Sequence, residues 1–594
     1  MKCMKKGFLF CVLILVLIII FTGCVSDDDP EILEESEEIK EDVMDMGDNS
    51  VDLIDAAKTL NGKVITGYQG WFGTPDDGFH ERGWMHWNWE EPTNKGGKQS
   101  VTFEMFPDLR EYNPDKLSKI DFDAFPDGRP AALFSSYCEE TVDLHFRWMQ
   151  DYGIDGVALQ RFLGEAVGWR SLHADTVASH VKKACEKYGR IFYICYDFSG
   201  YDNDDFVNAV KRDFERTVEN RLALTGSGNY LHHDGKPVVQ LWGMGVNGNY
   251  RRSPEESLEV IKFFKDKGYY VIGGVPTDWR IDSGDGIRGF RDVYAEFDMI
   301  SPWTVGRFGN SSEARTHYRS KIARDISYIQ DTGQDYMPVI FPGFAWSLWN
   351  GGARNMISRR SGEFLKTQMQ LAADMSPTAV YIAMFDEYDE ATAIMKAASD
   401  SSEIPKNSYF LTTSADGIYL SSDYYLRLAG AFTESFKRGA KGDDLGLDIA
   451  YSAGPVWFKS GFEKDMDAQA KANDIAKIIE TEYVLSGRYA LSVNSIEAFE
   501  IELVSDLDIL VSENTIFSCQ MYIVDMANKL DIVFYFDDGD KEYLPLVTAA
   551  AKPMLLFEPA QPLGQFAGRR IIAFGLSGER VSHLFLDDIC IEEK

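Results

Sequence analysis

Four carboxylates stand within five consecutive positions, Asp386, Glu387, Asp389 and Glu390, directly after the apolar run TAVYIAMF. Such a cluster is typical of three settings: a solvated loop, a calcium or magnesium site, and a pair of catalytic acids. Two close carboxyl groups push one another's pKa values apart, so that one keeps its proton near neutral pH. Adjacent positions seldom converge on one metal ion, which disfavours the metal site.

The apolar run before the cluster predicts a buried strand. Strict strand alternation would place Glu387 and Glu390 on opposite faces of the sheet. Both side chains reach one cleft only if the chain turns after Glu387. A turn at this strand end is therefore the structural condition for a paired-acid site, whereas Asp389 is expected to be solvated.

Other short apolar runs also end in aromatic or polar residues, which line sugar-binding clefts but also pack in protein cores. WMHWNW places a His-Trp pair beside further aromatics. The substrate-binding candidates are Trp71, Trp84, His86, Trp87, Gln160, Arg161, Tyr196, Asp197, Trp242, Trp303 and Tyr388. Arg161 ends a buried strand and needs a partner, which is either structural or the substrate.

These strand ends share one edge if the runs form a parallel barrel. Nine β-rich runs alternate with amphipathic segments over residues 52–405, and several are continuous Val- and Ile-rich stretches typical of strands buried on both faces. The segment SPEESLEVIKFFKDKG predicts a helix with Ser253 as N-cap, Glu256 closing a capping box and Gly268 as the stop. Repeated strand–helix units predict a (β/α)8 barrel with its active site at the carboxyl ends of the strands, although nine runs are one too many.

The pattern changes after this region. Residues 406–454 are interpreted as a linker and connecting segment, and residues 455–594 alternate with period two, which predicts an all-β, jelly-roll-like sandwich. The stretches SGFE (460–463) and FLDDICI (585–591) resemble the first and last strands of carbohydrate-binding modules. That resemblance implies a structural calcium held by Glu463, Asp587 and Asp588, with ordinary edge-strand acids as the alternative.

The N-terminus predicts export. Residues 1–24 hold three lysines and then an apolar stretch ending in Thr22-Gly23-Cys24, which resembles a prokaryotic lipoprotein signal with Cys24 as the lipidated residue. An uncleaved membrane anchor is the alternative, and both place the rest of the chain outside the cytoplasm, at the cell surface. Residues 25–51 are acidic and predict a solvated tether.

Charge and cysteine usage exclude other classes. The formal net charge of −34 provides no basic field for a nucleic-acid partner. The five cysteines outside the signal have scattered spacing, which supports neither a disulfide framework nor a zinc cluster. No cofactor for catalysis is predicted.

A family resemblance is carried by an ordered set of short pieces between about residues 60 and 400. The pieces are GYQGWF, WMHWNW, YGIDGVALQRF, YDFSGY, PVVQLWG, GGVPTDWR, SPWTVGRF, FPGFAW and FDEYDEATAI. Together they resemble the catalytic barrel of glycoside hydrolase family 71/99-like proteins, whose nearest characterised relatives are the family 99 endo-α-mannosidases. The family's Glu-x-x-Glu motif matches Glu387 and Glu390.

The resemblance implies retaining hydrolysis of an α-mannosidic bond with help from the substrate's 2-hydroxyl. Glu387 would act as base on that hydroxyl, giving a 1,2-anhydro sugar, and Glu390 as acid on the leaving oxygen and then as base on water. This chain has Tyr388 and Asp389 where the family has Trp-His, and Asp386 where Asn is more common. These changes put mannose specificity in doubt more than hydrolysis, and a glycan-binding surface lipoprotein without activity is the alternative.

Overall fold

The computed structural model of the chain describes residues 57–79, 83–95, 98–248, 252–281, 283–451, 456–460, 475–480, 489–505, 507–512, 515–547, 555–557 and 560–593. The predicted signal (1–24) with Cys24 and the predicted tether (25–51) lie outside these ranges. Within them, no helix has the length and apolar character needed to cross a membrane.

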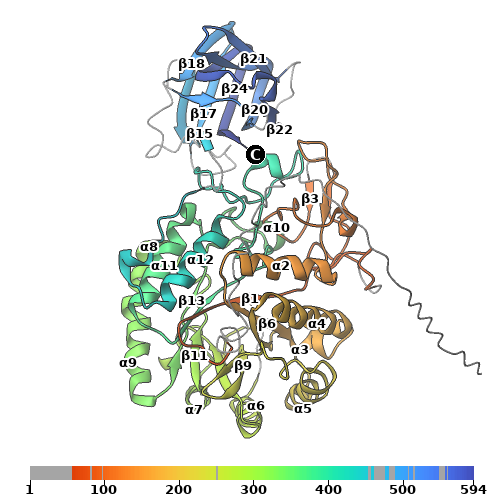
Figure 1. Ribbon diagram of the computed structural model, residues 1–594, viewed down its shortest axis with the longest axis vertical. Coiled ribbons are helices and arrows are strands. Elements are labelled where there is room, and N and C mark those ends of the chain that lie inside the picture. Colours follow the sequence, from red (N-terminus) through yellow and green to blue (C-terminus); the bar gives the residue numbers. More distant parts are fainter. Residues whose placement is uncertain are drawn as a thin grey trace, which may run out of the picture. The chain divides into compact units, whose positions relative to one another are not determined.

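A parallel sheet forms the core of the first part of the chain (Figure 1). Its strands pair in the order β12-β11-β10-β9-β7-β6-β1-β14-β13. The bounds are β1 Lys63–Tyr68, β6 Gly156–Phe162, β7 Ile191–Asp197, β9 Lys236–Trp242, β10 Tyr270–Val275, β11 Met299–Pro302, β12 Asp335–Tyr336, β13 Val339–Ile340 and β14 Ala379–Ile382.

The sheet closes on itself through one stretch of chain. β12 and β13 are two halves of this stretch, which is split at Pro338, a residue without a backbone N–H. On one side the Met337 N–H donates to the Ile300 carbonyl of β11 (2.9 Å), and on the other the Tyr381 N–H of β14 donates to the Pro338 carbonyl (3.0 Å). The described strands therefore occupy eight positions around a closed ring, and the predicted (β/α)8 barrel is confirmed.

One of the nine predicted runs, AALFSSYC at residues 131–138, lies outside the barrel. Its short strand β5 (Ala132–Leu133) pairs antiparallel with β4 (Ser118–Lys119). β1 and β6 pair directly with each other in parallel, so no position for another strand exists between them. Burial made this run look like a barrel strand, but burial does not reveal its pairing partner.

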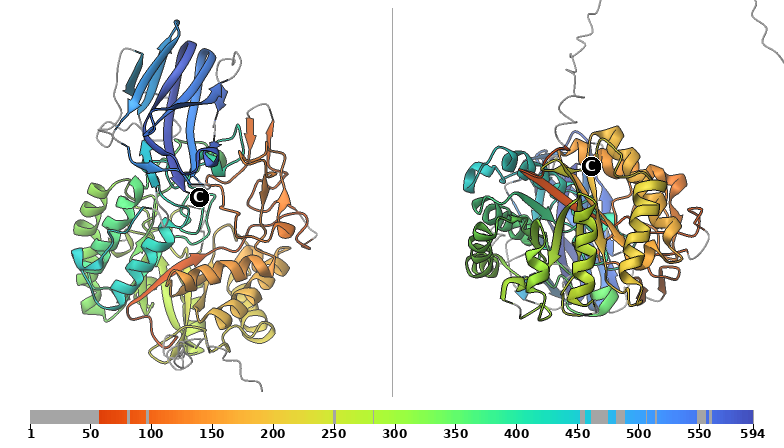
Figure 2. Two further views of the ribbon diagram at one scale, coloured as in Figure 1. Left: turned by 45° about the horizontal axis from the view of Figure 1, so that its top comes forward. Right: turned by 90° about the horizontal axis from the view of Figure 1, so that it is seen from below.

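Helices cover the outside of the barrel (Figure 2). The predicted capping box of α6 is present, with the Ser253 hydroxyl accepting from the Glu256 N–H (3.1 Å) and the Glu256 carboxylate accepting from the Ser253 N–H (2.9 Å). The helices are α2 Glu139–Asp151, α3 Leu163–Ala166, α4 Ser171–Tyr188, α5 Phe206–Asp213, α6 Pro254–Asp266, α7 Arg291–Ala295, α8 Ser311–His317, α9 Ala323–Thr332, α10 Ser347–Asn350, α11 Glu363–Asp374 and α12 Tyr424–Lys437.

Helix α12 corrects part of the predicted organisation. It follows β14 and lies within residues 406–454, the segment that the sequence predicts to be a linker. Its residues Leu428 and Phe432 are fully buried in the same apolar core as the barrel strands, and α12 contacts β1. This helix therefore belongs to the barrel, because its apolar face is buried in the barrel's core.

The C-terminal part is all-β, as predicted. Two long strands, β20 (Thr515–Phe536) and β24 (Arg570–Glu593), pair antiparallel along most of their length. Residues 536–540 form a hairpin turn, with the Phe536 N–H donating to the Asp540 carbonyl (3.0 Å). The other strands are β15 Val456–Ser460, β16 Ala476–Glu480, β17 Tyr489–Ser495, β18 Phe499–Val504, β19 Ile509–Leu510, β21 Lys541–Val547, β22 Leu555–Phe557 and β23 Ala560–Pro562.

Candidate active site

The acidic cluster lies just beyond the carboxyl end of β14, where the chain turns. Residues 388–391 form a turn, and the Thr392 and Ala393 N–H groups both donate to the Glu387 carbonyl. The Asp386 carboxylate accepts from the backbone N–H groups of Gln69 (2.7 Å) and Gly70 (2.8 Å), which ties the turn to the end of β1. The condition set by the sequence is met, since the turn brings Glu387 and Glu390 to one cavity.

A cavity of about 350 Å³ lies at this end of the barrel. Its lining includes eight of the residues that sequence reasoning proposed for chemistry or substrate contact: Trp71, His86, Gln160, Asp197, Trp242, Trp303, Glu387 and Glu390. They come from β6, from β7, from β9 and from the segments just after β1, β11 and β14. Strands far apart in sequence meet here because the carboxyl ends of all parallel barrel strands point to the same face.

Aromatic rings form the cavity walls. The Trp71 indole stacks on the His86 imidazole, with ring centroids 3.9 Å apart and planes 7° from parallel. Across the lining, the rings of Trp242 and Trp303 meet edge to face at 5.3 Å. Trp349 also lines the cavity and is 52% exposed, which places it at the rim.

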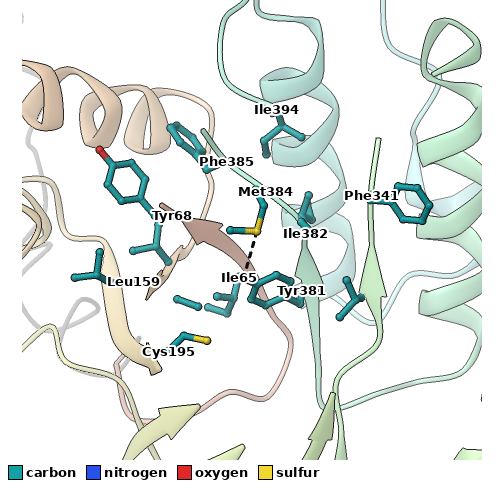
Figure 3. Close-up of a cluster of buried hydrophobic side chains, with 14 of the residues drawn as sticks. Ile65, Tyr68, Leu159, Cys195, Phe341, Tyr381, Ile382, Met384, Phe385 and Ile394 are labelled. Atoms are coloured by element: carbon teal, nitrogen blue, oxygen red, sulfur yellow. Dashed lines mark hydrogen bonds between the residues drawn. The ribbon is translucent and has the colours of Figure 1, made fainter. Parts of the chain in front are cut away.

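Figure 3 shows a cluster of buried side chains that includes Ile382, Met384 and Phe385, which directly precede the acidic cluster in the sequence. Tyr381 and Met384 lie side by side there, with the phenol donating to the Met384 sulfur at 3.6 Å. Both residues also line the cavity. Gln160 donates from its amide nitrogen to the same Tyr381 oxygen (3.0 Å), which fixes the amide at the end of β6.

The cavity favours protonated carboxyl groups. Burial raises the pKa of Glu387 well above its ordinary value, and the nearby Glu390 and Asp389 raise it further. Burial, with Asp389 beside it, also raises the pKa of Glu390, to about 7. Neighbouring acids in one cavity titrate as a unit, so Glu387 and Glu390 together retain a proton at neutral pH.

Asp389 and His86 form an ion pair at the cavity wall. The His86 Nδ1 lies 3.3 Å from the Asp389 carboxylate, and the His86 Nε2 lies 3.9 Å from Glu165. Burial opposes a charge on the imidazole, but the hydrogen bonds and charges of Asp389 and Glu165 outweigh it and raise the His86 pKa. Asp389 is only 4% exposed, so the expectation that it is solvated is wrong.

Asp197 provides a further carboxyl at the end of β7. Burial raises its pKa to about 7, although its bonds from the Ser199 N–H and hydroxyl act in the opposite direction. A neutral carboxyl can donate a hydrogen bond as well as accept one. Asp197 is therefore suited to hold a sugar hydroxyl.

Two strand-end candidates point away from the cavity. Arg161 is buried against the helices, where its guanidinium pairs with Asp213 (2.6 Å) and Asp175 (2.9 Å). The Tyr196 hydroxyl donates to the same Asp213 (2.6 Å). Successive side chains on a strand face opposite sides, so Gln160 lines the cavity while Arg161 faces outward. For Arg161 and Tyr196 the prediction of substrate contact is corrected to a structural role.

Three aromatic candidates also pack in the core and do not line the cavity. Trp87 is fully buried, stacks on Phe72 at 3.9 Å and donates its indole N–H to the Phe134 carbonyl (2.9 Å). Tyr388 is fully buried and donates its hydroxyl to the Lys396 carbonyl (2.5 Å), and Trp84 is 8% exposed. Each prediction of substrate contact is corrected here, because the residue's ring is enclosed by its own chain.

Sequence reasoning missed several lining residues: Gln69, Phe162, Ser199, Trp349, Tyr381, Met384 and Asp389. Phe162 carries a detectable signal, since it stands two positions after Gln160 on the same strand face. Gln69 and Ser199 follow strand ends and could have been found in the same way. Trp349 lies on the short helix α10, and no strand periodicity points to it.

The predicted calcium site is untested. Glu463 lies outside the described residues, and the side chain of Asp588 is likewise not described. Asp587 is 4% exposed. Among the described residues, no group of three or more His, Cys, Asp or Glu side chains is arranged to hold a metal ion.

Comparisons with known proteins add fold similarity only. No protein-family model matches the chain, and no curated protein matches it. A solved structure of the GH99 endo-alpha-mannosidase from Bacteroides thetaiotaomicron shares 17% identity, with coverage of 64% of this chain and 99% of that one and a TM-score of 0.45. The CBM22-1 xylan-binding domain from Paenibacillus barcinonensis shares 17% identity, with coverage of 24% and 97% and a TM-score of 0.20. Similarity at this level says nothing about the reaction or the sugar.

Proposed function

We propose that the chain is a glycoside hydrolase in which Glu387 and Glu390 act on a glycosidic bond held in the barrel cavity. The observation that carries this proposal is the turn after β14, which brings both glutamates into a cavity walled by Trp71, Trp242 and Trp303. Tryptophan rings suit the apolar faces of sugars, and a carboxyl pair that retains a proton suits general acid–base catalysis.

The roles within the pair follow the family resemblance. Glu390, whose pKa is about 7, gives a proton to the leaving oxygen, and Glu387 accepts the proton of the sugar's 2-hydroxyl, in an endo-α-mannosidase-like retaining reaction. The 2-oxygen bonds to the anomeric carbon as the leaving oxygen departs, which gives a 1,2-anhydro sugar. Water then attacks the anomeric carbon and breaks its bond to the 2-oxygen, while Glu390 takes a proton from the water and Glu387 returns its proton to the 2-oxygen. Because the Glu387 pKa is also raised, Glu387 must be deprotonated before it can act as this base.

The proposed location is the outer surface of a prokaryotic membrane. The N-terminal lysines, the apolar stretch that follows them and Cys24 support an exported protein with an N-terminal lipid anchor. Carbohydrate is the proposed partner, and the C-terminal β domain is proposed as a carbohydrate-binding module, with calcium as its possible structural ion.

The test is cleavage of polysaccharides by the purified chain. Yeast α-mannan and xylan are incubated with the wild-type chain and with the Glu387→Gln and Glu390→Gln variants, and new reducing ends are counted. We expect release by the wild-type chain and a loss of at least about 100-fold in each variant. Release that survives both substitutions would refute the site, whereas binding without release would favour the glycan-binding alternative.

A further inference from the structure

A tight turn joins an aromatic side chain of the cavity wall, His86, to an exposed one, Trp89. His86 and Trp89 both have left-handed backbone conformations, with φ of 59° and 66°. Residues other than glycine keep such conformations only where the surrounding structure holds them. The turn is held by the Trp89 N–H donating to the Trp84 carbonyl (2.8 Å) and by the Thr102 hydroxyl donating to the His86 carbonyl (2.9 Å).

The rings continue outward as a ladder from the cavity wall. The Trp71 ring stacks on His86 at 3.9 Å, and the His86 ring meets Trp89 at 4.9 Å. The Arg170 guanidinium then lies 4.4 Å from the Trp89 ring and 4.7 Å from the Trp169 ring. The rim ladder, Trp89–Arg170–Trp169, is thus continuous with the candidate active site.

Charges hold the ladder in place. Arg170 is hydrogen-bonded to Glu165, which lies beside His86, which in turn pairs with Asp389 in the cavity. Basic and acidic side chains alternate in the series Arg170, Glu165, His86 and Asp389, so each charged group lies next to one of opposite charge. The two tryptophans remain 44% and 45% exposed although the groups between them are fixed.

The geometry points to a sugar-binding subsite on the exposed parts of Trp89 and Trp169, around the Arg170 guanidinium that lies over both rings, which receives a neutral glycan chain whose reacting bond lies in the cavity. Two held indole rings offer apolar surface at little conformational cost. The net charge of −34 and the acidic cavity disfavour an anionic polysaccharide. This inference rests on the proposed function and specifies its substrate as a chain that extends past the cavity and is cut internally.

The test compares a long and a short substrate in variants of the full chain. The long substrate is yeast α-mannan, and the short one is α-mannobiosyl fluoride, which has only two sugar rings. Trp169→Ala should lower the ratio of kcat/KM on mannan to kcat/KM on the fluoride by about 10-fold, through KM. Trp169→Phe should restore most of the ratio, and Leu172→Ala, a neighbouring 56% exposed residue outside the ladder, should not alter it.

The outcomes separate this inference from the proposed function. An unchanged ratio in Trp169→Ala and in Trp89→Ala would overturn the rim subsite and leave the hydrolase standing. Activity that survives Glu387→Gln and Glu390→Gln would instead refute the proposed catalytic pair. In affinity electrophoresis, unretarded migration of the wild-type protein through gels that contain mannan or xylan would also overturn the subsite. Neither neutral polysaccharide would then be bound.

Discussion

Replacing Glu390 with glutamine should stabilise the protein in alkaline solution. The folded protein raises the Glu390 pKa from 4.5 to about 7, chiefly by burial and by the neighbouring Asp389. A carboxyl with a raised pKa contributes fully to stability below pH 4.5, and that contribution is lost as the pH rises through about 7. The glutamine variant keeps the shape of the side chain and never carries the charge.

The magnitude follows from the two pKa values. The difference between 4.5 and about 7 corresponds to roughly 3 kcal/mol at most, reached above pH 7. For a barrel of this length, that free energy raises the melting temperature by up to roughly 4 °C. We expect this rise at pH 8 and almost none at pH 4.5.

Differential scanning fluorimetry at the two pH values measures the effect. Glu434→Gln is the matched control, because that carboxylate is exposed on α12 and its loss should leave both melting temperatures unchanged within a degree. A variant at Glu390 that melts at the same temperature as the wild-type chain at pH 8, or lower, would refute the argument that the charge is disfavoured in the cavity.

Three further predictions concern the surrounding groups. Arg161→Met should cost about 3–5 kcal/mol of stability, because Asp213 is left buried without its cation and Asp175 keeps only Arg221; an unchanged urea midpoint would contradict the structural role. Asp389→Asn removes a negative charge that raises the Glu390 pKa. The alkaline limb of the plot of kcat/KM against pH should therefore move to lower pH by roughly 1 pH unit, and a move to higher pH would contradict this electrostatic effect. EDTA should leave kcat unchanged, since no catalytic metal is proposed; a loss restored by a divalent cation would reopen the metal reading.

The sequence predicts the barrel and the position of its active edge from local patterns. Buried runs followed by polar or aromatic residues identify Gln160, Asp197 and Trp242, because each stands at the end of its own strand. The same patterns misassign Arg161 and Tyr196, whose neighbours on the strand face the cavity. Applying the period of two at each strand end would have separated the inward from the outward residues.

Other features depend on contacts between distant segments. Asp389 was expected to be solvated because four acids in five positions suggest a surface loop, but the turn carries it onto His86, 303 positions earlier in the chain. The left-handed turn at His86 and Trp89 is equally hidden, since histidine only weakly favours a positive φ and tryptophan does not favour it. Partners of this kind follow from the folded structure and not from spacing.

The dependence of cleavage on the leaving group tests the central claim most directly. A fluoride leaves without a proton, so α-mannobiosyl fluoride bypasses the acid that a mannan linkage requires. If Glu390 is the acid and Glu387 the base, Glu390→Gln should lose at least about 100-fold in kcat on mannan and recover most of it on the fluoride, whereas Glu387→Gln should stay inactive on both. Equal losses on both substrates in both variants, or full activity on mannan in either, would contradict the account.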